Sequence, residues 1–288
     1  MNRRRFFLLA LALFLGTVLP CFGARMYASR IKVFVSIAPM LEAVSDIGGP
    51  RFEVGLLIPP GYTPENFSPN SRTFNDLSHA KALLTIGMPY EKTLVSRLRQ
   101  SMPQVRLFDM TDGMTFRDFP GHDGVPAPDP HVWLSLQNME CFALNAGKAL
   151  AQLLPEEARD IQMRANVYVG KLRKLRAELV AIMAPLKGKT MLVTHPAFGY
   201  FAADFELRQL AVEREGKEPG PQELGEFIKL AQAENCRTLF FPLQHGDRLA
   251  YIVAKRISLT MDVKPLDPLP KAYLEGMKQL ADALQKGL

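Results

Sequence analysis

The chain has 288 residues, of which 48% are hydrophobic and 22% are charged. This composition is typical of a globular protein with a substantial core, and it excludes a disordered chain, a collagen-like fibre and a coiled-coil rod. The formal net charge is +6, and loss of the three arginines near the N-terminus would lower it to +3. Because the charge is modest and no basic patch is interleaved with aromatic residues, the sequence does not predict nucleic-acid binding.

The first residues have the pattern of an export signal. Arg3, Arg4 and Arg5 precede an apolar run, residues 6–19, that is too short to cross a bilayer. Cys21 and Gly23 are the small residues expected before a cleavage after Gly23. We therefore predict that residues 1–23 are a removed signal peptide and that the mature protein is periplasmic. Lipid attachment at Cys21 is the alternative, although a proline directly before that cysteine fits the attachment signal poorly.

Two cysteines follow the predicted cleavage point, Cys141 and Cys236. An oxidising compartment would permit a disulfide between them. However, they lie in different halves of the chain, in or beside apolar runs, so we expect two buried free thiols.

Short apolar runs alternate with helical stretches along the rest of the chain. The first half predicts strands at 31–37, 52–58, 82–86 and 105–108, with helices at 40–47 and 90–100. The second half predicts strands at 190–194, 207–212, 238–243 and 262–266, with helices at 221–234, 249–258 and 271–284. Such alternation is typical of an α/β fold with mostly parallel sheets.

One long helix is predicted between the halves, over residues 155–184. Pro155 suits a first helical turn, and the following Glu156 and Glu157 suit the positive end of the helix dipole. Apolar residues then recur at alternating steps of four and three, at Ile161, Ala165, Tyr168, Leu172, Leu175, Leu179 and Ile182. At 1.5 Å per residue the helix would be about 45 Å long, enough to run the length of a two-lobed molecule. We interpret the basic residues on its other face as solvated.

Four side chains are candidate metal ligands. His131 lies in the stiff Asp-Pro-His-Val-Trp segment, where prolines keep the backbone out of a helix. His195 and Asp267 each follow a predicted strand, and open α/β sheets bind ligands at the carboxyl ends of their strands. Glu65 lies in a proline-rich loop, residues 59–69, after another strand. Two imidazoles and two carboxylates could form a closed site for zinc, manganese or iron.

Each of these residues also has an ordinary structural explanation. His131 could be a surface-loop residue, and His195 could be satisfied by a backbone carbonyl. Asp267 could cap the following helix, and Glu65 could simply be solvated. We interpret the remaining His79 and His245 as structural or surface residues.

Several motifs in order resemble one known family. They are Leu-Ile-Pro-Pro-Gly at 57–61, Pro-Glu-Asn-Phe-Ser-Pro at 64–69, Gly-x-x-x-Glu at 87–91, Asp-Pro-His-Val-Trp at 129–133, His-Pro-Ala-Phe-Gly-Tyr-Phe at 195–201, Glu-Pro-Gly-Pro at 218–221 and Leu-Asp-Pro-Leu at 266–269. Together they resemble the zinc- and manganese-binding class of ABC-transporter substrate-binding proteins, over nearly all of the mature chain.

This resemblance implies a fold, a function and a site. The fold would be two α/β lobes, residues 30–150 and 188–288, joined by one long rigid linking helix. The protein would not be an enzyme. As a monomer, it would capture zinc or manganese, with iron also possible, in the cleft between the lobes and deliver it to a membrane permease. Its metal ligands would be Glu65, His131, His195 and Asp267.

The sequence departs from the family pattern at three places. Glu65 stands where a histidine is usual, which favours manganese or iron over zinc. The segment before Asp-Pro-His, residues 119–128, contains His122 but not the His-rich loop of zinc-specific members. Pro242 replaces an acidic residue that is common after the later Phe-containing strand.

The sequence alone leaves two other classes of protein possible. A metal-dependent hydrolase would need an open zinc position and a base, but the chain contains no His-Glu-x-x-His motif. The other class is a metal-free adhesin or scaffold.

Overall fold

The computed structural model describes residues 29–65, 67–119, 127–213 and 219–288. The predicted signal peptide, His122 and Glu218 lie outside these residues. No helix in the described ranges is long and apolar enough to cross a membrane.

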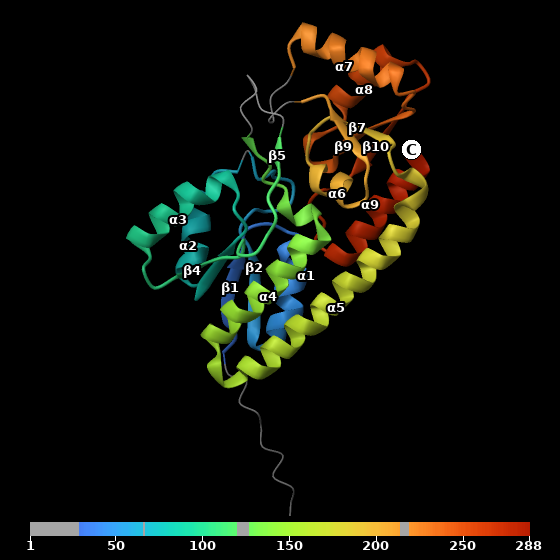
Figure 1. The fold of residues 1–288 in the computed structure, drawn as a ribbon. Coiled ribbons are helices and arrows are strands. Elements are labelled where there is room, and N and C mark those ends of the chain that lie inside the picture. Colours follow the sequence, from blue (N-terminus) through green and yellow to red (C-terminus); the bar gives the residue numbers. More distant parts are fainter. Residues whose placement is uncertain (1–28, 66, 120–126, 214–218) are drawn as a thin grey trace, which may run out of the picture.

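The first half of the chain forms a parallel four-stranded sheet in the order β2-β1-β3-β4. Its strands are β1 (Ile31–Val35), β2 (Phe52–Leu56), β3 (Ala82–Thr85) and β4 (Arg106–Asp109), all four at the predicted places. The helices that connect them are α1 (Met40–Gly48), α2 (Ser71–Ser78) and α3 (Pro89–Ser101). Figure 1 shows α2 and α3 on one side of this sheet and α1 on the other.

The second half forms another parallel sheet in the order β10-β9-β7-β8. Its strands are β7 (Thr190–Val193), β8 (Arg208–Ala211), β9 (Thr238–Pro242) and β10 (Asp262–Leu266), again as predicted. Its helices are α6 (Gly199–Asp204), α7 (Pro221–Ala233), α8 (Arg248–Ile257) and α9 (Tyr273–Gly287). The two-lobed α/β fold is therefore confirmed.

Helix α2 is eight residues long, and the Asn70 side chain caps it by accepting the Thr73 amide at 3.1 Å. Shorter elements were not predicted from the sequence. Helix α6 has six residues, and strands β5 (Asp118–Phe119) and β6 (Ala127–Pro128) form a two-residue antiparallel pair. Elements of this length contain too few residues to show a hydrophobic period.

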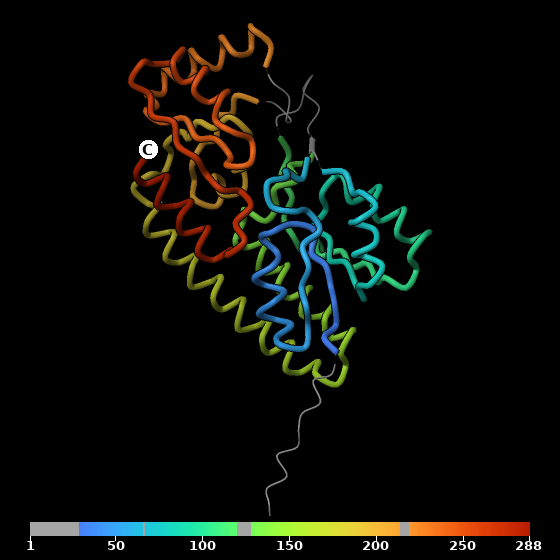
Figure 2. The backbone as a smooth tube through the Cα atoms, turned by 180° about the vertical axis from the view of Figure 1, so that it is seen from behind, coloured from blue at the N-terminus to red at the C-terminus, as the bar shows by residue number. Residues whose placement is uncertain are grey.

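The predicted linking helix is confirmed as α5 (Ala158–Met183), with short 3-10 turns at Pro155–Glu157 and Ala184–Leu186. The predicted apolar residues from Ile161 to Leu179 are buried, and Ile182 is partly buried. They pack on α1, on α4 (Leu136–Leu153) and on α9. In Figure 2 the C-terminal helix α9, in red, runs alongside α5, in yellow. Because the main core cluster continues from the first sheet to α9, α5 and α9 join the lobes into one packed body.

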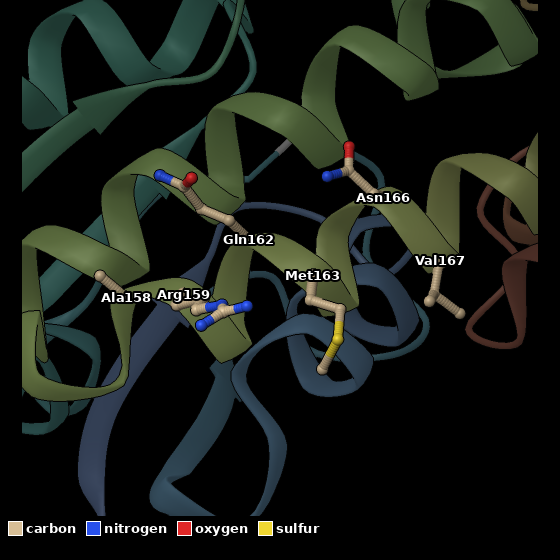
Figure 3. A pocket seen from close by; sticks show the side chains of 6 residues that line it. All are labelled: Ala158, Arg159, Gln162, Met163, Asn166 and Val167. Atoms are coloured by element: carbon tan, nitrogen blue, oxygen red, sulfur yellow. The ribbon is translucent and has the colours of Figure 1, made fainter.

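The opposite face of α5 lies at the surface. Figure 3 shows its side chains over a shallow depression, including Met163 and Val167, which are more than half exposed. The two cysteines are unpaired, as expected. However, the prediction that Cys141 and Cys236 are buried is wrong, because both are only partly buried at helix or loop surfaces.

Hydrogen bonds around Trp133 also join the lobes. Its indole Nε1 donates to the carbonyl of Pro268 at 2.6 Å, and Tyr273 Oη donates to the Trp133 carbonyl at 2.7 Å. Trp133 and Tyr273 are both fully buried. The first of these bonds fixes Trp133, two residues after His131, against Pro268, the residue after Asp267. The ends of the two sheets that carry the candidate ligands therefore face each other across a fixed junction.

The packing of α5 predicts unequal effects of truncating its side chains. Leu172→Ala removes a side chain that is 0% exposed, so it should lower the free energy of unfolding by about 2–5 kcal/mol. Val167→Ala, on the exposed face of the same helix, should change it by no more than about 0.5 kcal/mol. Urea unfolding of both variants would test this, and equal effects would contradict the described packing.

Candidate metal centre

His131 is buried and its ring is fixed by a carboxylate. The residue lies just before the 3-10 turn Val132–Leu134 and is 3% exposed. Its Nδ1 is 2.8 Å from Asp129 Oδ1, which also accepts the His131 backbone amide at 2.9 Å. A carboxylate can only accept, so Nδ1 carries the hydrogen, and Nε2 is left as the ligating atom. From the other lobe, Tyr200 Oη donates to the Asp129 carbonyl at 3.1 Å and so fixes this segment.

His195 has the same arrangement in the second lobe. It follows β7, as predicted, and is 4% exposed. Its Nδ1 is 2.8 Å from Glu213 Oε2, and its buried Nε2 has no hydrogen-bond partner among the described residues. Glu213 was not predicted as part of the site. Its position just after β8, which pairs with β7, is the signal that could have identified it.

Glu65 lies between the two histidines. Its Oε1 is 3.4 Å from His131 Nε2 and 3.9 Å from His195 Nε2. The two rings are 5.4 Å apart between centroids. The structure therefore brings together three of the four predicted ligands, two from the first half of the chain and one from the second.

Asp267, the fourth predicted ligand, is held by two hydrogen bonds. Its Oδ1 accepts hydrogen bonds from Gln244 Nε2 at 2.8 Å and from the Leu269 amide at 2.9 Å. A cavity of about 10 Å³ is lined by Glu65, His131 and His195 but not by Asp267. Asp267 instead lines a neighbouring cavity of about 210 Å³.

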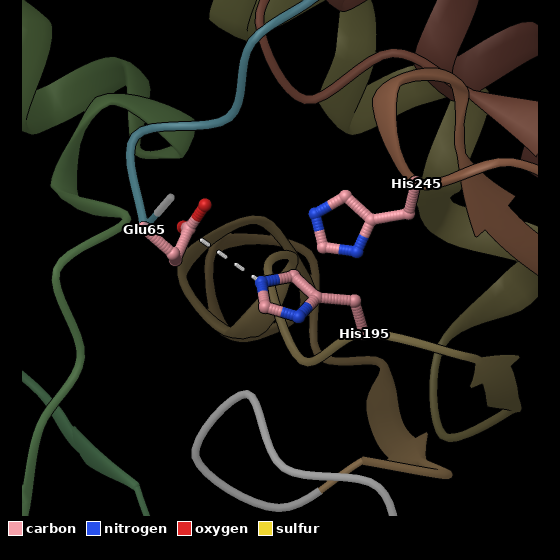
Figure 4. A group of neighbouring side chains, drawn as sticks. All are labelled: Glu65, His195 and His245. Atoms are coloured by element: carbon pink, nitrogen blue, oxygen red, sulfur yellow. Dashed lines mark ion pairs between the residues drawn. The ribbon is translucent and has the colours of Figure 1, made fainter. Parts of the chain in front are cut away.

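His245 lies at the site, although the sequence analysis treated it as a structural or surface residue. It ends the 3-10 turn Leu243–His245 after β9, and its ring centroid is 4.5 Å from that of His195. Ligating atoms of Glu65, His195 and His245 all lie within 4.8 Å of one another (Figure 4). Its position after a strand, the feature that identified His195 as a candidate ligand, could also have identified His245. By contrast, His79 is an exposed residue bonded to the Asn75 carbonyl, as expected.

Polar atoms without partners gather around the small cavity. Among the described residues, four buried side-chain atoms lack a hydrogen bond, and three of them belong to residues that line it: Thr63 Oγ1, His195 Nε2 and Gln244 Oε1. Leaving one such atom unsatisfied costs about 1–3 kcal/mol, so a cluster of them indicates a binding site. The nitrogen and carboxylate ligands fit a divalent transition metal.

The charges at the site also favour a cation. Burial tends to raise the pKa of Glu65, but the hydrogen bond and charge of His131 outweigh it and lower this pKa to about 2. Burial tends to lower the pKa of His131, but Asp129 and Glu65 outweigh it and raise this pKa to about 9. Without metal at neutral pH, an anionic Glu65 therefore faces a protonated His131. Burial, followed by the charge of His195, lowers the pKa of His245.

This charge arrangement predicts that metal binding releases a proton. The raised pKa keeps His131 protonated up to about pH 9, and a protonated imidazole cannot ligate. Metal affinity should therefore rise with pH up to that value, with the release of about one proton per ion at neutral pH. Calorimetric titrations in buffers of different ionisation enthalpy would measure the release. Binding heats independent of the buffer would contradict the prediction.

Asp129 and Glu213, which accept from the Nδ1 atoms of the two histidines, should affect metal affinity although they would not bind the ion. Glu213→Gln should lower metal affinity by about 10- to 100-fold, because a neutral amide replaces the carboxylate that orients His195 and makes its imidazole more basic. Glu226→Gln, at an exposed position on α7, is the matched control and should leave affinity unchanged. Competition with a chromophoric chelator would measure both. Equal affinities of the two variants would show that Glu213 does not support the site.

Comparisons with known proteins identify the family of this chain. The family model described as zinc-uptake complex component A, periplasmic, matches residues 33–287. A zinc-bound deletion variant of ZnuA has a similar structure, with a TM-score of 0.83 and 30% identity, covering 90% of this chain and 98% of that one. The zinc-binding protein AdcA of Streptococcus pyogenes is 24% identical over 90% of this chain, which spans 55% of the AdcA length.

A third relative shows the same fold with another metal. The substrate-binding protein FpvC of Pseudomonas aeruginosa, solved in complex with Mn²⁺, has a TM-score of 0.78 and 20% identity, covering 90% of this chain and 98% of that one. At this identity the likeness concerns the fold alone. The match to the family model over residues 33–287 shows that the chain belongs to the family of periplasmic zinc-uptake component A proteins, which are metal-capturing components of ABC importers rather than enzymes.

Proposed function

We propose that this protein captures zinc or manganese in the cleft between its lobes and delivers the ion to the membrane permease of its importer. One observation carries this proposal: two buried imidazoles, each fixed at Nδ1 by a carboxylate, direct Nε2 toward one oxygen of Glu65. Metal-ligating histidines have this second carboxylate partner in many proteins. The family match does not favour a hydrolase or a metal-free scaffold.

The residues that hold the ion would come from both lobes. Residues 30–150 would contribute Glu65 and His131, and residues 188–288 would contribute His195. The family resemblance adds Asp267 as the fourth ligand, whereas the geometry brings His245 to the same place. Zinc, manganese and iron all accept such nitrogen and oxygen ligands. Zinc is the ion named for AdcA and bound in the ZnuA variant, and manganese is the ion in the FpvC complex.

Delivery would depend on the loops that carry the ligands more than on a wide hinge. Helix α5 and the Trp133 hydrogen bonds tie the lobes together, so a large rotation would break buried contacts. Glu65 and His245, in contrast, lie on exposed loop segments. We propose that contact with the permease displaces these two side chains and releases the ion.

The cellular location would follow from the N-terminal segment. We propose that residues 1–23 are removed as a signal peptide and that the mature chain works as a periplasmic monomer. Retention of Cys21 as a lipid anchor is the alternative.

Elemental analysis of the protein purified without chelator tests the proposed function. We expect about one zinc or manganese ion per chain. His131→Ala and His195→Ala should each lose the ion, because each removes a ligand with a preset orientation. His79→Ala, at an exposed histidine outside the site, should keep it.

Two results would contradict the proposal. One is a wild-type chain that holds no ion and takes up neither zinc nor manganese when they are added. The other is full occupancy in the His131→Ala and His195→Ala variants.

A further inference from the structure

We infer that His245, in place of Asp267, is the fourth metal ligand of this protein and that it makes the site selective for zinc over manganese. This inference rests on the proposed function, because it concerns the same ion. It differs from the ligand set that the family resemblance implies.

The positions of the ligating atoms favour His245. Glu65, His195 and His245 each offer an atom within 4.8 Å of the other two, and this group contains neither Asp267 nor His131. His131 is joined to it through Glu65, whose Oε1 lies 3.4 Å from His131 Nε2, whereas Asp267 has no such contact with the group among the described residues. Around a tetrahedral zinc ion with bonds of about 2.0 Å, ligand atoms lie about 3.3 Å apart. The separations of Glu65 Oε1 from His131 Nε2 and His195 Nε2, 3.4 and 3.9 Å, are already close to that value.

The two cavities separate the competing residues. The cavity of about 10 Å³ has room for a single ion or water, and His245 lines it together with Glu65, His131 and His195. Asp267 lines the adjacent and larger cavity. The ion would therefore lie beside the His245 ring and away from the Asp267 carboxylate.

The turn that places His245 also engages Asp267. Gln244 Nε2 donates to Asp267 Oδ1 at 2.8 Å, and the Leu269 amide donates to the same oxygen. These two bonds occupy both lone pairs of Oδ1, so ligation through this oxygen would displace one of the two donors. Because Gln244 directly precedes His245 in the chain, the same short turn binds the Asp267 carboxylate and places the His245 imidazole at the small cavity.

The backbone of this turn is restricted on both sides. Pro242, with φ of −66°, precedes the turn and fixes the direction in which the chain leaves β9. Gly246, with φ of +75°, follows it in the left-handed region that glycine adopts most easily. The departure of Pro242 from the family pattern thus has a structural role, since it begins the turn that ends at His245.

The resulting ligand set favours zinc. Glu65 replaces a histidine of the family pattern, and His245 would restore the number of imidazoles to three. Imidazole nitrogen suits zinc, whereas carboxylate oxygen suits manganese better. A site with three imidazoles and one carboxylate should therefore discriminate against manganese more strongly than one with two of each.

The test uses the mature protein, X-ray absorption at the zinc edge and chelator competition with zinc and with manganese. We expect three imidazoles around zinc in the wild type and in Asp267→Asn, and two in His245→Ala. His245→Ala should lower zinc affinity by about 100-fold and manganese affinity by less than about 10-fold. Asp267→Asn, which keeps the oxygen that accepts from Gln244, should lower either affinity by less than about 10-fold.

Opposite results would overturn the inference. These are two imidazoles around zinc in the wild type, or an unchanged zinc affinity in His245→Ala together with a large loss in Asp267→Asn. His195→Ala distinguishes this failure from failure of the proposed function. If His195→Ala loses the ion while His245→Ala keeps it, the capture function stands and only the role of His245 is wrong.

Discussion

The site depends on two hydrogen bonds, from His131 Nδ1 to Asp129 and from His195 Nδ1 to Glu213, each 2.8 Å long. A buried imidazole without such a partner could rotate or exchange its ring hydrogen between nitrogens. With the carboxylate in place, the hydrogen stays on Nδ1 and Nε2 points toward the cleft, where it can ligate once it has no proton. Glu65 lies where the two Nε2 atoms converge. The metal chemistry of the cleft therefore follows from the position of two residues that would not touch the ion.

The rest of the fold holds these pairs in place. His195 and Glu213 follow the paired parallel strands β7 and β8, where side chains from different strands meet, whereas Asp129 and His131 lie between β6 and the 3-10 turn Val132–Leu134. Tyr200 bonds to the Asp129 carbonyl from the other lobe, and Trp133 and Tyr273 join the two ligand-bearing segments. Helix α5 and the continuous core limit how far the lobes can separate. Such a frame suits a protein that must hold a small ion firmly and release it through local loop movement.

The sequence predicted the two sheets and the linking helix better than it predicted the metal site. All eight strands of the two sheets and the linking helix were predicted, because each has a hydrophobic period or an apolar run that is visible locally. Helix α6 was missed because its six residues are too few for that signal. His245 and Glu213 were missed because their relevance depends on the strand order β10-β9-β7-β8, which brings together segments distant in the chain. Asp267 was a candidate from its place after a predicted strand and from the family resemblance, and its hydrogen bond to Gln244 could not be seen without the fold.

A crystal structure of the mature protein loaded with zinc, with anomalous data collected on both sides of the zinc edge, tests the central claim most directly. One strong anomalous peak should lie between the lobes, within bonding distance of Glu65 and of Nε2 of His131 and His195. A peak elsewhere on the surface, or an ion bound by only one lobe, would contradict capture in the interlobe cleft.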